Sequence, residues 1–396
     1  MGFEGVIGVR GFLAVALMLA GMGFAAPTKA QEAERAALQA LLSDGAGAVT
    51  VTPEFAQAVP EAQLDGLLET LAAQVGPVEE IDLQPSGAGE LRSASHEVPV
   101  RIVLDDQGRI AGLRFGAPEP LVADLRAAVA GLEGLGAEVS WLVQRDGEVL
   151  AAQGAAHPLA VASAFKLGIL SVLAREVRAG KTDWDRVLRI AEPHRSLPTG
   201  RLQDFPTDAP VTLHTAALLM IAESDNTATD LLLDLLGRET VAEELGIAPE
   251  ALLSTREFFA LKADPVAAQV WRDAEPEARP SIAAEAAILP PDVAAVNGPS
   301  VPGIEWYLPL ETLCALIEPM ADLPLLQLNP GPASGLAPAA YKGGSEPGVL
   351  NFTVALHGSE ERLICAALTV NDPGPIDEIA ASGAFRALLR RAMAQP

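Results

Sequence analysis

The sequence predicts an α+β protein with two structured parts, a small α+β domain over residues 31–118 and a larger layered domain over residues 119–396. Strand patterns lie near both ends of the larger part and helical patterns fill its middle. That order is expected when an antiparallel sheet layer with its helices is split by a helical insertion. A Gly-Ala-Pro-Glu-Pro segment at residues 116–120 is expected to be the linker, because Gly and Pro mark loops.

The small domain shows helical periodicity over residues 33–43 and 60–75. Residues 99–115 then alternate apolar and polar side chains on both sides of an Asp-Gln-Gly triplet at 106–108, which predicts a β-hairpin. We find no combination of residues in this domain that would support catalysis.

The larger domain is expected to open with an amphipathic helix and a hairpin, and then to enter a helix with an almost wholly apolar face. Two strands and a terminal helix close the chain. The expected elements are helix 121–135, strands 139–144 and 148–154, helix 161–177, a mostly helical insertion over about 178–328, strands 348–357 and 363–370, and helix 377–393.

Charge excludes one class of function. The 396 residues carry 27 basic and 52 acidic side chains, a formal net charge of -25. Such a chain repels phosphate backbones, so nucleic-acid binding is not expected. A content of 49% apolar residues argues against disorder. We expect a monomer.

Residues 1–30 have the pattern of a secretory signal, with an apolar run at 11–26 followed by small residues before Gln31. The alternative is an uncleaved membrane anchor, which the short run disfavours. The mature protein is therefore expected to be secreted or periplasmic and free of the membrane.

The two cysteines, Cys314 and Cys365, both lie in apolar patterns and far apart in sequence. Buried free thiols are the favoured interpretation, and a disulfide is the alternative. The five histidines form no metal-binding pattern, so neither a metal nor another cofactor is expected.

Three short motifs carry the chemistry, and the first is SAFK at residues 163–166. Its spacing places Ser163 and Lys166 one helical turn apart. Burial among apolar neighbours lowers the pKa of a lysine, so Lys166 becomes a candidate base for a nucleophilic Ser163. Only five lysines occur in the chain, and no other has a serine three residues before it.

The second motif is Ser-Asp-Asn at 224–226, and the third is Lys-Gly-Gly-Ser at 342–345. Ser224 is a candidate proton shuttle and Asn226 a candidate partner of a substrate amide, although the triplet taken alone also fits a helix N-cap. Lys342 is placed to attract a substrate carboxylate, just before the next strand. Gly344 allows close backbone approach, and the N–H of Ser345 is a candidate oxyanion donor with that of Ser163.

The order SxxK, SDN and K-G-G resembles the signature of class A β-lactamases and penicillin-binding proteins over residues 121–396. This resemblance implies a β-lactamase/transpeptidase-like fold. The two-domain order also resembles that of a β-lactamase-like protein associated with clavulanic acid biosynthesis, whose front domain is similar to a cystatin or isomerase-type α+β fold.

The resemblance implies a secreted serine hydrolase that opens β-lactam rings through an acyl-Ser163 intermediate, and so a role in antibiotic breakdown and resistance. One alternative is a D-alanyl-D-alanine carboxypeptidase, an esterase or a penicillin-binding protein, which uses the same motifs. Another is a non-catalytic binding protein on the same scaffold.

Two positions depart from the family pattern. Gly343 stands where a hydroxyl residue is usual, and Ser345 is its candidate replacement. Glu257 is the candidate base for deacylation, but Leu261 stands four residues later where the family has asparagine. The alternative is a helix-surface glutamate paired with Arg256 or Lys262, in which case deacylation is expected to be weak.

Overall fold

The structure is a computed structural model that describes residues 28–289 and 293–395, and it is α+β. Most of the expected signal, residues 1–27, lies outside the described residues. Within the described residues no helix is both long and apolar enough to cross a bilayer. The chain divides into two compact units, one containing the described residues up to Glu69 with Ile81–Gly89 and Val100–Arg114, the other Thr70–Glu80, Glu90–Pro99 and Phe115–Pro396.

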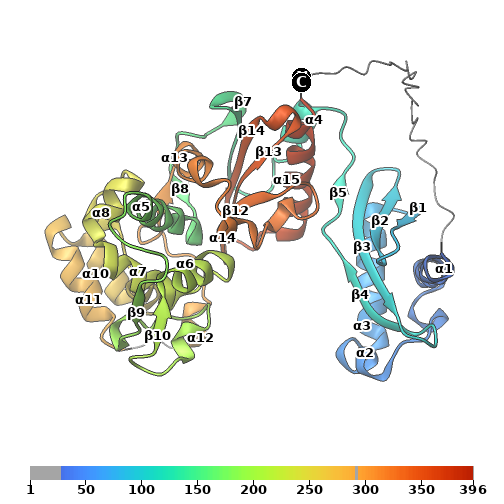
Figure 1. The fold of residues 1–396 in the computed structure, drawn as a ribbon, viewed down its shortest axis with the longest axis horizontal. Coiled ribbons are helices and arrows are strands. Elements are labelled where there is room, and N and C mark those ends of the chain that lie inside the picture. The colour runs from blue at the N-terminus through green and yellow to red at the C-terminus, as the bar shows by residue number, and fades with distance from the viewer. Residues whose placement is uncertain (1–27, 290–292, 396) are drawn as a thin grey trace, which may run out of the picture. The chain divides into compact units, whose positions relative to one another are not determined.

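The chain begins with three helices and continues into a small antiparallel sheet (Figure 1). Helix α1 starts with a capping box in which Thr28 and Gln31 bond to each other's backbone N–H. The strand order is β1-β2-β3-β4, with β5 paired to β3. The elements are α1 (Lys29–Asp44), α2 (Pro53–Ala58), α3 (Glu61–Val75), β1 (Val78–Leu83), β2 (Ala88–Ser93), β3 (His96–Leu104), β4 (Ile110–Phe115) and β5 (Glu119–Pro120).

The hairpin expected around residues 106–108 is confirmed between β3 and β4. Asp105 makes the turn, since its carboxylate accepts hydrogen bonds from the N–H groups of Gln107 at 2.9 Å and Arg109 at 2.8 Å. Gly108 has φ +76°, a left-handed conformation that glycine adopts without strain.

The expected linker at 116–120 is only partly a loop, because β5 pairs with β3 through Glu119 and Glu97. The helix expected over 121–135 is also shorter. It is α4 (Leu125–Ala130), which begins where the Asp124 carboxylate caps the N–H of Ala127 at 2.8 Å.

A five-stranded antiparallel sheet forms the centre of the larger part, in the order β12-β13-β14-β6-β7. Strands distant in sequence meet here, since β14 near the C-terminus pairs with β6. Strand β12 is at an edge of the sheet, so one side of its backbone faces away from β13. The strands are β6 (Glu138–Arg145), β7 (Glu148–Gln153), β12 (Ala339–Glu346), β13 (Val349–His357) and β14 (Leu363–Asn371).

The two faces of this sheet pack against different helices, as alternation along a strand requires. On β6, Trp141 and Val143 join the core formed with α4 and α15 (Glu378–Met393), whereas Leu142 joins the larger core of the helical segment. Figure 1 shows α15 on one side of the sheet and the helical segment on the other.

Between β7 and β12 the chain is mostly helical, with two short strand pairs, β8 with β11 and β9 with β10. The elements are β8 (Leu159–Ala160), α5 (Lys166–Arg178), β9 (Val187–Arg189), β10 (Pro210–Thr212), α6 (Leu213–Ala222), α7 (Asn226–Leu236), α8 (Arg238–Leu245), α9 (Thr255–Ala263), α10 (Pro265–Asp273), α11 (Arg279–Ala286), α12 (Val293–Val296), β11 (Tyr307–Leu308), α13 (Leu310–Ile317) and α14 (Pro324–Gln327).

The prediction of free thiols is wrong, because Cys314 and Cys365 form a disulfide. Helix α13 packs on β14 within the larger core, which brings the two Cα atoms to 5.8 Å although 51 positions separate them in sequence. The prediction that both side chains are buried in apolar surroundings is correct, but their pairing depends on the packing of the helix on the strand.

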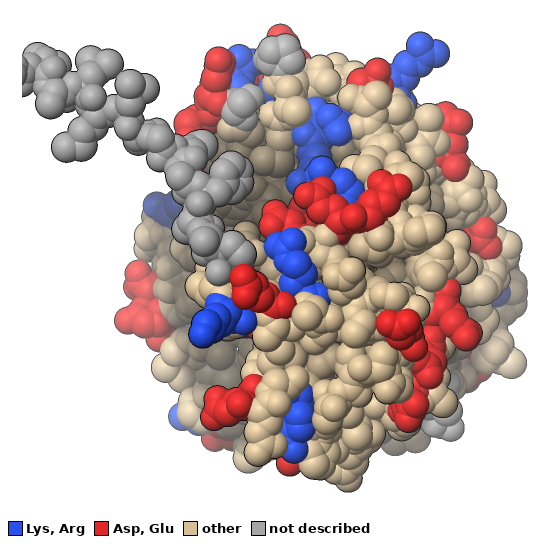
Figure 2. All heavy atoms as spheres, turned by 90° about the vertical axis from the view of Figure 1, so that its right-hand side faces the viewer, with Lys and Arg blue, Asp and Glu red and all other residues tan. Residues whose placement is uncertain are grey.

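The surface has no obvious site for a polyanion on the face that Figure 2 shows. There, among the described residues, Lys and Arg side chains lie in small groups beside Asp and Glu and form no continuous basic area. This distribution agrees with the net charge of -25.

Candidate active site

Ser163 lies in a single turn of 3-10 helix, Ala162–Phe165, and not in the α-helix expected over 161–177. Helix α5 begins only at Lys166. The delay follows from the backbone at Ala162, whose φ of +44° is incompatible with an α-helix. Strained conformations of this kind concentrate at functional sites.

The turn is held from below by an aromatic stack. The Phe165 ring lies 4.2 Å from the Trp306 ring, nearly parallel to it. The carbonyl of Trp306 also accepts a hydrogen bond of 2.9 Å from the N–H of Val161. Within residues 161–170 every residue is buried except Ser163, which is half-buried. The turn therefore presents Ser163 at the surface of an otherwise closed core.

Strand β12 passes directly over this turn. The third motif was expected to precede a strand, but residues 342–345 are themselves in β12, paired along their length with β13. A Cβ atom on Gly344 would lie 2.5 Å from the backbone nitrogen of Ser163 and 2.2 Å from the carbonyl oxygen of Val161. Only glycine permits this approach, so position 344 brings the strand backbone to the Ser163 N–H.

The amino group of Lys166 is fully buried and bonded to the second motif. Its Nζ donates to the Ser224 carbonyl at 2.7 Å, the Ser224 hydroxyl at 3.1 Å and the Asn226 Oδ1 at 2.7 Å. None of these three bonds goes to the Ser163 hydroxyl. The structure thus brings the first and second motifs together through the lysine.

Burial lowers the pKa of Lys166 well below its usual value, and the nearby Lys342 lowers it further. The carboxylates of Asp230 and Asp225 act in the opposite direction. A depressed pKa gives the neutral amine that a general base requires.

Lys342 approaches the same serine from the third motif. Its Nζ lies 3.3 Å from the Ser224 hydroxyl and also donates to the carbonyl of Gly343. Burial lowers the pKa of Lys342 to about 7. One hydroxyl therefore lies between two amines, Lys166 and Lys342, an arrangement in which Ser224 can pass a proton from one side to the other.

Ser224 is held in place by its own backbone. It has φ +56°, and its carbonyl accepts a 2.8 Å bond from the hydroxyl of Thr199. The next residue, Asp225, is the N-cap of α7 and also accepts the N–H groups of Arg201 at 2.6 Å and Leu202 at 2.9 Å. Capping is thus the role of Asp225, while its two neighbours contact the lysine.

Asn226 was expected to contact a substrate amide, but both ends of its side chain already have partners. Its Oδ1 accepts from Lys166, and its Nδ2 donates to the carbonyl of Leu197 at 2.9 Å. In this arrangement Asn226 orients the amine of Lys166.

The carboxylate of Glu257 is bonded to residues outside the three motifs. Its carboxylate accepts two bonds from Arg238, at 2.8 and 2.7 Å, and one from the N–H of Ser254 at 2.8 Å. It is the third residue of α9 and completes a capping box with Ser254. These bonds give Glu257 a structural role. They also replace the expected pairing with Arg256 or Lys262.

The expected replacement hydroxyl of Ser345 is also engaged, because it donates to Glu378 at the start of α15. At position 343 a Cβ atom would lie 2.1 Å from the hydroxyl of Tyr341. The phenol occupies the space that a Thr or Ser side chain would need, which is the physical reason for glycine there.

Sequence reasoning missed two buried polar residues around the site. Asp230 accepts the N–H groups of Thr255 at 2.7 Å and Arg256 at 2.9 Å, so it anchors the start of α9, and burial raises its pKa to about 7. Lys262 is 5% exposed and pairs with Glu346 of β12. The scarcity of lysine was a signal that its third buried copy has a specific role.

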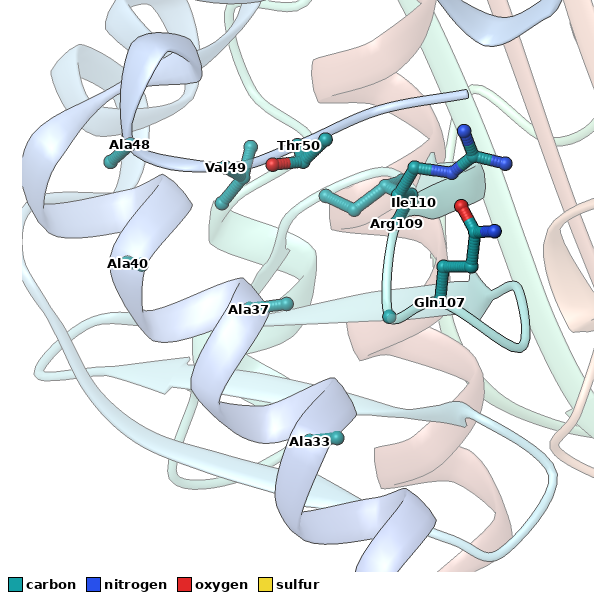
Figure 3. A pocket seen from close by; sticks show the side chains of 10 residues that line it. Ala33, Ala37, Ala40, Ala48, Val49, Thr50, Gln107, Arg109 and Ile110 are labelled. Atoms are coloured by element: carbon teal, nitrogen blue, oxygen red, sulfur yellow. The ribbon is translucent and has the colours of Figure 1, made fainter. Parts of the chain in front are cut away.

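A second hollow lies in the first unit, with a volume of about 480 Å³. One face of α1, made of alanines, lines it together with the turn between β3 and β4 (Figure 3). Arg109 of this wall is held by Asp105 of the same turn at 2.7 Å. The lining contains one hydroxyl, that of Thr50, but no His, Asp or Glu that could act as its base.

Comparison with known proteins gives one family match. Residues 120–255 match the model of the Beta-lactamase2 family, described as "Beta-lactamase enzyme family". The match includes the first two motifs, ends before Glu257 and does not reach β12. It supports the resemblance to the β-lactamase superfamily for that segment. No curated protein matches the chain.

Several solved structures are similar at low identity. The β-lactamase from Sphaerobacter thermophilus DSM 20745 is 20% identical, with a TM-score of 0.48, over 69% of this chain and 98% of that one. PBP-A is 14% identical, with a TM-score of 0.46, over 67% and 94%. An ancestral class A β-lactamase is 16% identical, with a TM-score of 0.48, over 68% and 99%.

Proposed function

We propose that this chain is a serine hydrolase of the β-lactamase and penicillin-binding protein superfamily, which opens β-lactam rings through an acyl-Ser163 intermediate. One observation carries the proposal. The Ser224 hydroxyl lies between the buried amines of Lys166, at 3.1 Å, and Lys342, at 3.3 Å, and β12 crosses the Ser163 turn beside them. A non-catalytic scaffold has no physical need to bury two lysines around one hydroxyl.

The chemistry follows from these positions. The neutral amine of Lys166 takes the Ser163 proton as the serine oxygen attacks the carbonyl carbon of the ring. Backbone N–H groups of the Ser163 turn and of β12 stabilise the oxyanion. The carbon–nitrogen bond then breaks, and the proton reaches the ring nitrogen through Ser224. The ammonium of Lys342 attracts the substrate carboxylate.

Deacylation is expected to be slow. A water attacking the acyl-enzyme needs a base, and the carboxylate of Glu257 is already bonded to Arg238 and Ser254. The second candidate is therefore a penicillin-binding protein or a D-alanyl-D-alanine carboxypeptidase or esterase, in which a lasting penicillin adduct is the expected behaviour.

We also propose that the mature protein is an exported monomer acting on a small molecule. The buried disulfide between Cys314 and Cys365 supports export, because disulfides persist in oxidising compartments. Fractionation of cells and a mass measurement of the exported chain would test export and the cleavage near residue 30. Sedimentation would test the monomer.

The experiment follows the mass of the mature protein after mixing with a penicillin, in parallel with Ser163→Ala. The expected result is a mass increase equal to the intact penicillin on Ser163, stable for many minutes. A rapid return to the original mass would show efficient hydrolysis and refute the expectation of weak deacylation. No adduct in either protein would overturn the proposed function and leave the non-catalytic scaffold.

The two enzyme candidates are separated by a second substrate. Release of D-alanine from a peptide ending in D-alanyl-D-alanine, dependent on Ser163, supports the carboxypeptidase. Hydrolysis of β-lactams without that release supports the β-lactamase. The two assays use the same preparation, so misfolding affects both equally.

A further inference from the structure

The C-terminal end of β12, four residues after Lys342, carries a second buried charged cluster. Lys262, in the last turn of α9, donates to the carboxylate of Glu346, the last residue of β12. Their side chains are 1% and 9% exposed. The Lys262 amine also lies 5.9 Å from the centre of the Phe258 ring. Because both side chains are buried, the pair differs from surface ion pairs, which contribute little to stability.

Glu305 is the third member of this cluster. Its Oε1 accepts the N–H of Val301 at 2.9 Å, while its Oε2 and the Oε1 of Glu346 are both buried without a hydrogen-bond partner. Burial and the carboxylate of Glu346 raise the pKa of Glu305 to about 9. A proton on Glu305 gives both unpartnered oxygens a bond, since its O–H then donates to Glu346.

The cluster adjoins the backbone that shapes the candidate active site. Because side chains alternate along a strand, Glu346 lies on the same face of β12 as Gly344, which touches the Ser163 N–H. Glu305 directly precedes Trp306, which stacks on Phe165 and bonds Val161. Both carboxyl groups are thus one or two residues from contacts that hold the Ser163 turn.

Helix α9 connects this cluster to the second motif. Its first residue, Thr255, is bonded to Asp230, and its hydroxyl donates to the carbonyl of Asn226 at 3.1 Å. Its last turn carries Lys262, which reaches β12. The helix therefore connects the start of α7 to the end of β12.

We propose that Lys262, Glu346 and Glu305 are positioning residues, which share one proton and fix β12 against the Ser163 turn so that the backbone N–H groups meet the oxyanion. This inference rests on the proposed acylation of Ser163. The cluster is neutral as a whole while Glu305 holds its proton. Loss of that proton places two carboxylates against each other in a buried site, and they repel.

The charged and titratable groups around Glu305 come from four elements and one loop. Lys262 comes from α9 and Glu346 from β12, while Tyr307 of β11, Glu138 of β6 and Asp372 after β14 line a hollow of about 390 Å³ that also contains Glu305. Glu138 is exposed. It provides a matched control, because Glu138→Gln removes a carboxylate from the same hollow without touching the cluster.

The test measures the first-order rate constant for acylation of Ser163 by a saturating penicillin between pH 6 and 10. In the wild type this constant is expected to fall at least tenfold as pH rises through about 9, and in Glu305→Gln this alkaline fall is expected to be absent. Glutamine keeps an N–H donor toward Glu346 but does not titrate. Lys262→Met is expected to lower the constant at least tenfold at every pH, and Lys262→Arg to recover most of it.

Unchanged profiles in Glu305→Gln and Lys262→Met, with normal acylation in the wild type, would overturn the inference. An alkaline fall shared by Glu305→Gln and Glu138→Gln would assign it to another group and do the same. No acylation of the wild type at any pH would instead overturn the proposed function.

A measurement without substrate separates the two failures. Folding raises the pKa of Glu305 from its ordinary value of 4.5 to about 9. The contribution of this group to stability is therefore full below pH 4.5 and is lost as pH rises to about 9. The melting temperature of Glu305→Gln is therefore expected to gain on that of the wild type between pH 5 and 9. Parallel melting curves would contradict the shared proton whatever the enzyme does.

Discussion

Two positions along strand β12 are beside buried lysines with different partners. At Lys342, in the middle of the strand, two amines share the neutral hydroxyl of Ser224. At the Glu346 end, one lysine meets a carboxylate in a direct ion pair. Burial lowers the pKa of both amines at Ser224, which favours a neutral base there, whereas Lys262 contacts the carboxylate of Glu346. The polar partner, and not the burial, distinguishes the two lysines of the proposed mechanism from Lys262.

The largest expected effect comes from removing Lys166, the proposed base. Lys166→Met is expected to slow acylation of Ser163 by about 10³-fold, within the range of general base catalysis. In the wild type the rate should rise with pH as the Lys166 amine, whose pKa is depressed by burial, loses its proton.

Stopped-flow acylation of Lys166→Met, Lys181→Met and the wild type provides the measurement. Lys181 is a surface lysine with a side chain 70% exposed, so its variant controls for loss of a positive charge. Equal rates in Lys166→Met and the wild type would remove Lys166 from the mechanism.

The next effect is on stability, and it concerns the disulfide between Cys314 and Cys365, which is outside β12. The double variant Cys314→Ala, Cys365→Ala removes a disulfide between residues 51 positions apart. The entropy of the unfolded chain predicts a loss of about 4 kcal/mol in the free energy of unfolding, and engineered disulfides often contribute less than such predictions. Urea unfolding under non-reducing conditions measures the change. If this less stable but folded variant is acylated at the normal rate at 25 °C, loss of stability alone does not explain the slower acylation expected of the lysine variants.

A smaller effect is expected at the other reactive lysine. Lys342→Met should weaken the apparent Kd for a penicillin by about 10- to 100-fold, the loss of one charge-assisted bond. Because burial lowers the pKa of Lys342 to about 7, its charge is present below that pH and absent above it. Wild-type affinity should therefore fall as pH rises through 7, and that of the variant should not. A pH-independent wild-type Kd would contradict this role.

The smallest effect concerns the point where β12 crosses the Ser163 turn. Gly344→Ala would place a methyl group 2.5 Å from the Ser163 nitrogen, so the strand must shift, at a cost of about 1–3 kcal/mol. Gly112→Ala on β4 is a matched control, since its added methyl makes ordinary contacts at 3.7 Å. Thermal unfolding and acylation of both variants would show whether close approach at residue 344 is needed.

Local features of this protein follow from its sequence. Alternation and turn chemistry predicted the hairpin around residues 106–108, and apolar periodicity predicted β13, β14 and α15 within a few residues. The three motifs also identified the lysine, serine and asparagine side chains that the structure brings together. These signals are local. The side-chain repeat is 2 residues in a strand and 3.6 in a helix, so each repeat, like a short motif, is complete within a few residues.

Tertiary structure decided which distant residues meet. The Cys314–Cys365 pair, the bonds of Glu257 to Arg238 and the ion pair of Lys262 with Glu346 all join segments separated by many residues. A 3-10 turn after the left-handed backbone of Ala162 replaces the start of the expected helix, and the hydroxyl of Tyr341 explains glycine at 343. The sequence shows that a charge is buried, but its partner depends on the packing of helices on the sheet. That packing places a hydroxyl beside the buried amines of Lys166 and Lys342, and a carboxylate beside that of Lys262.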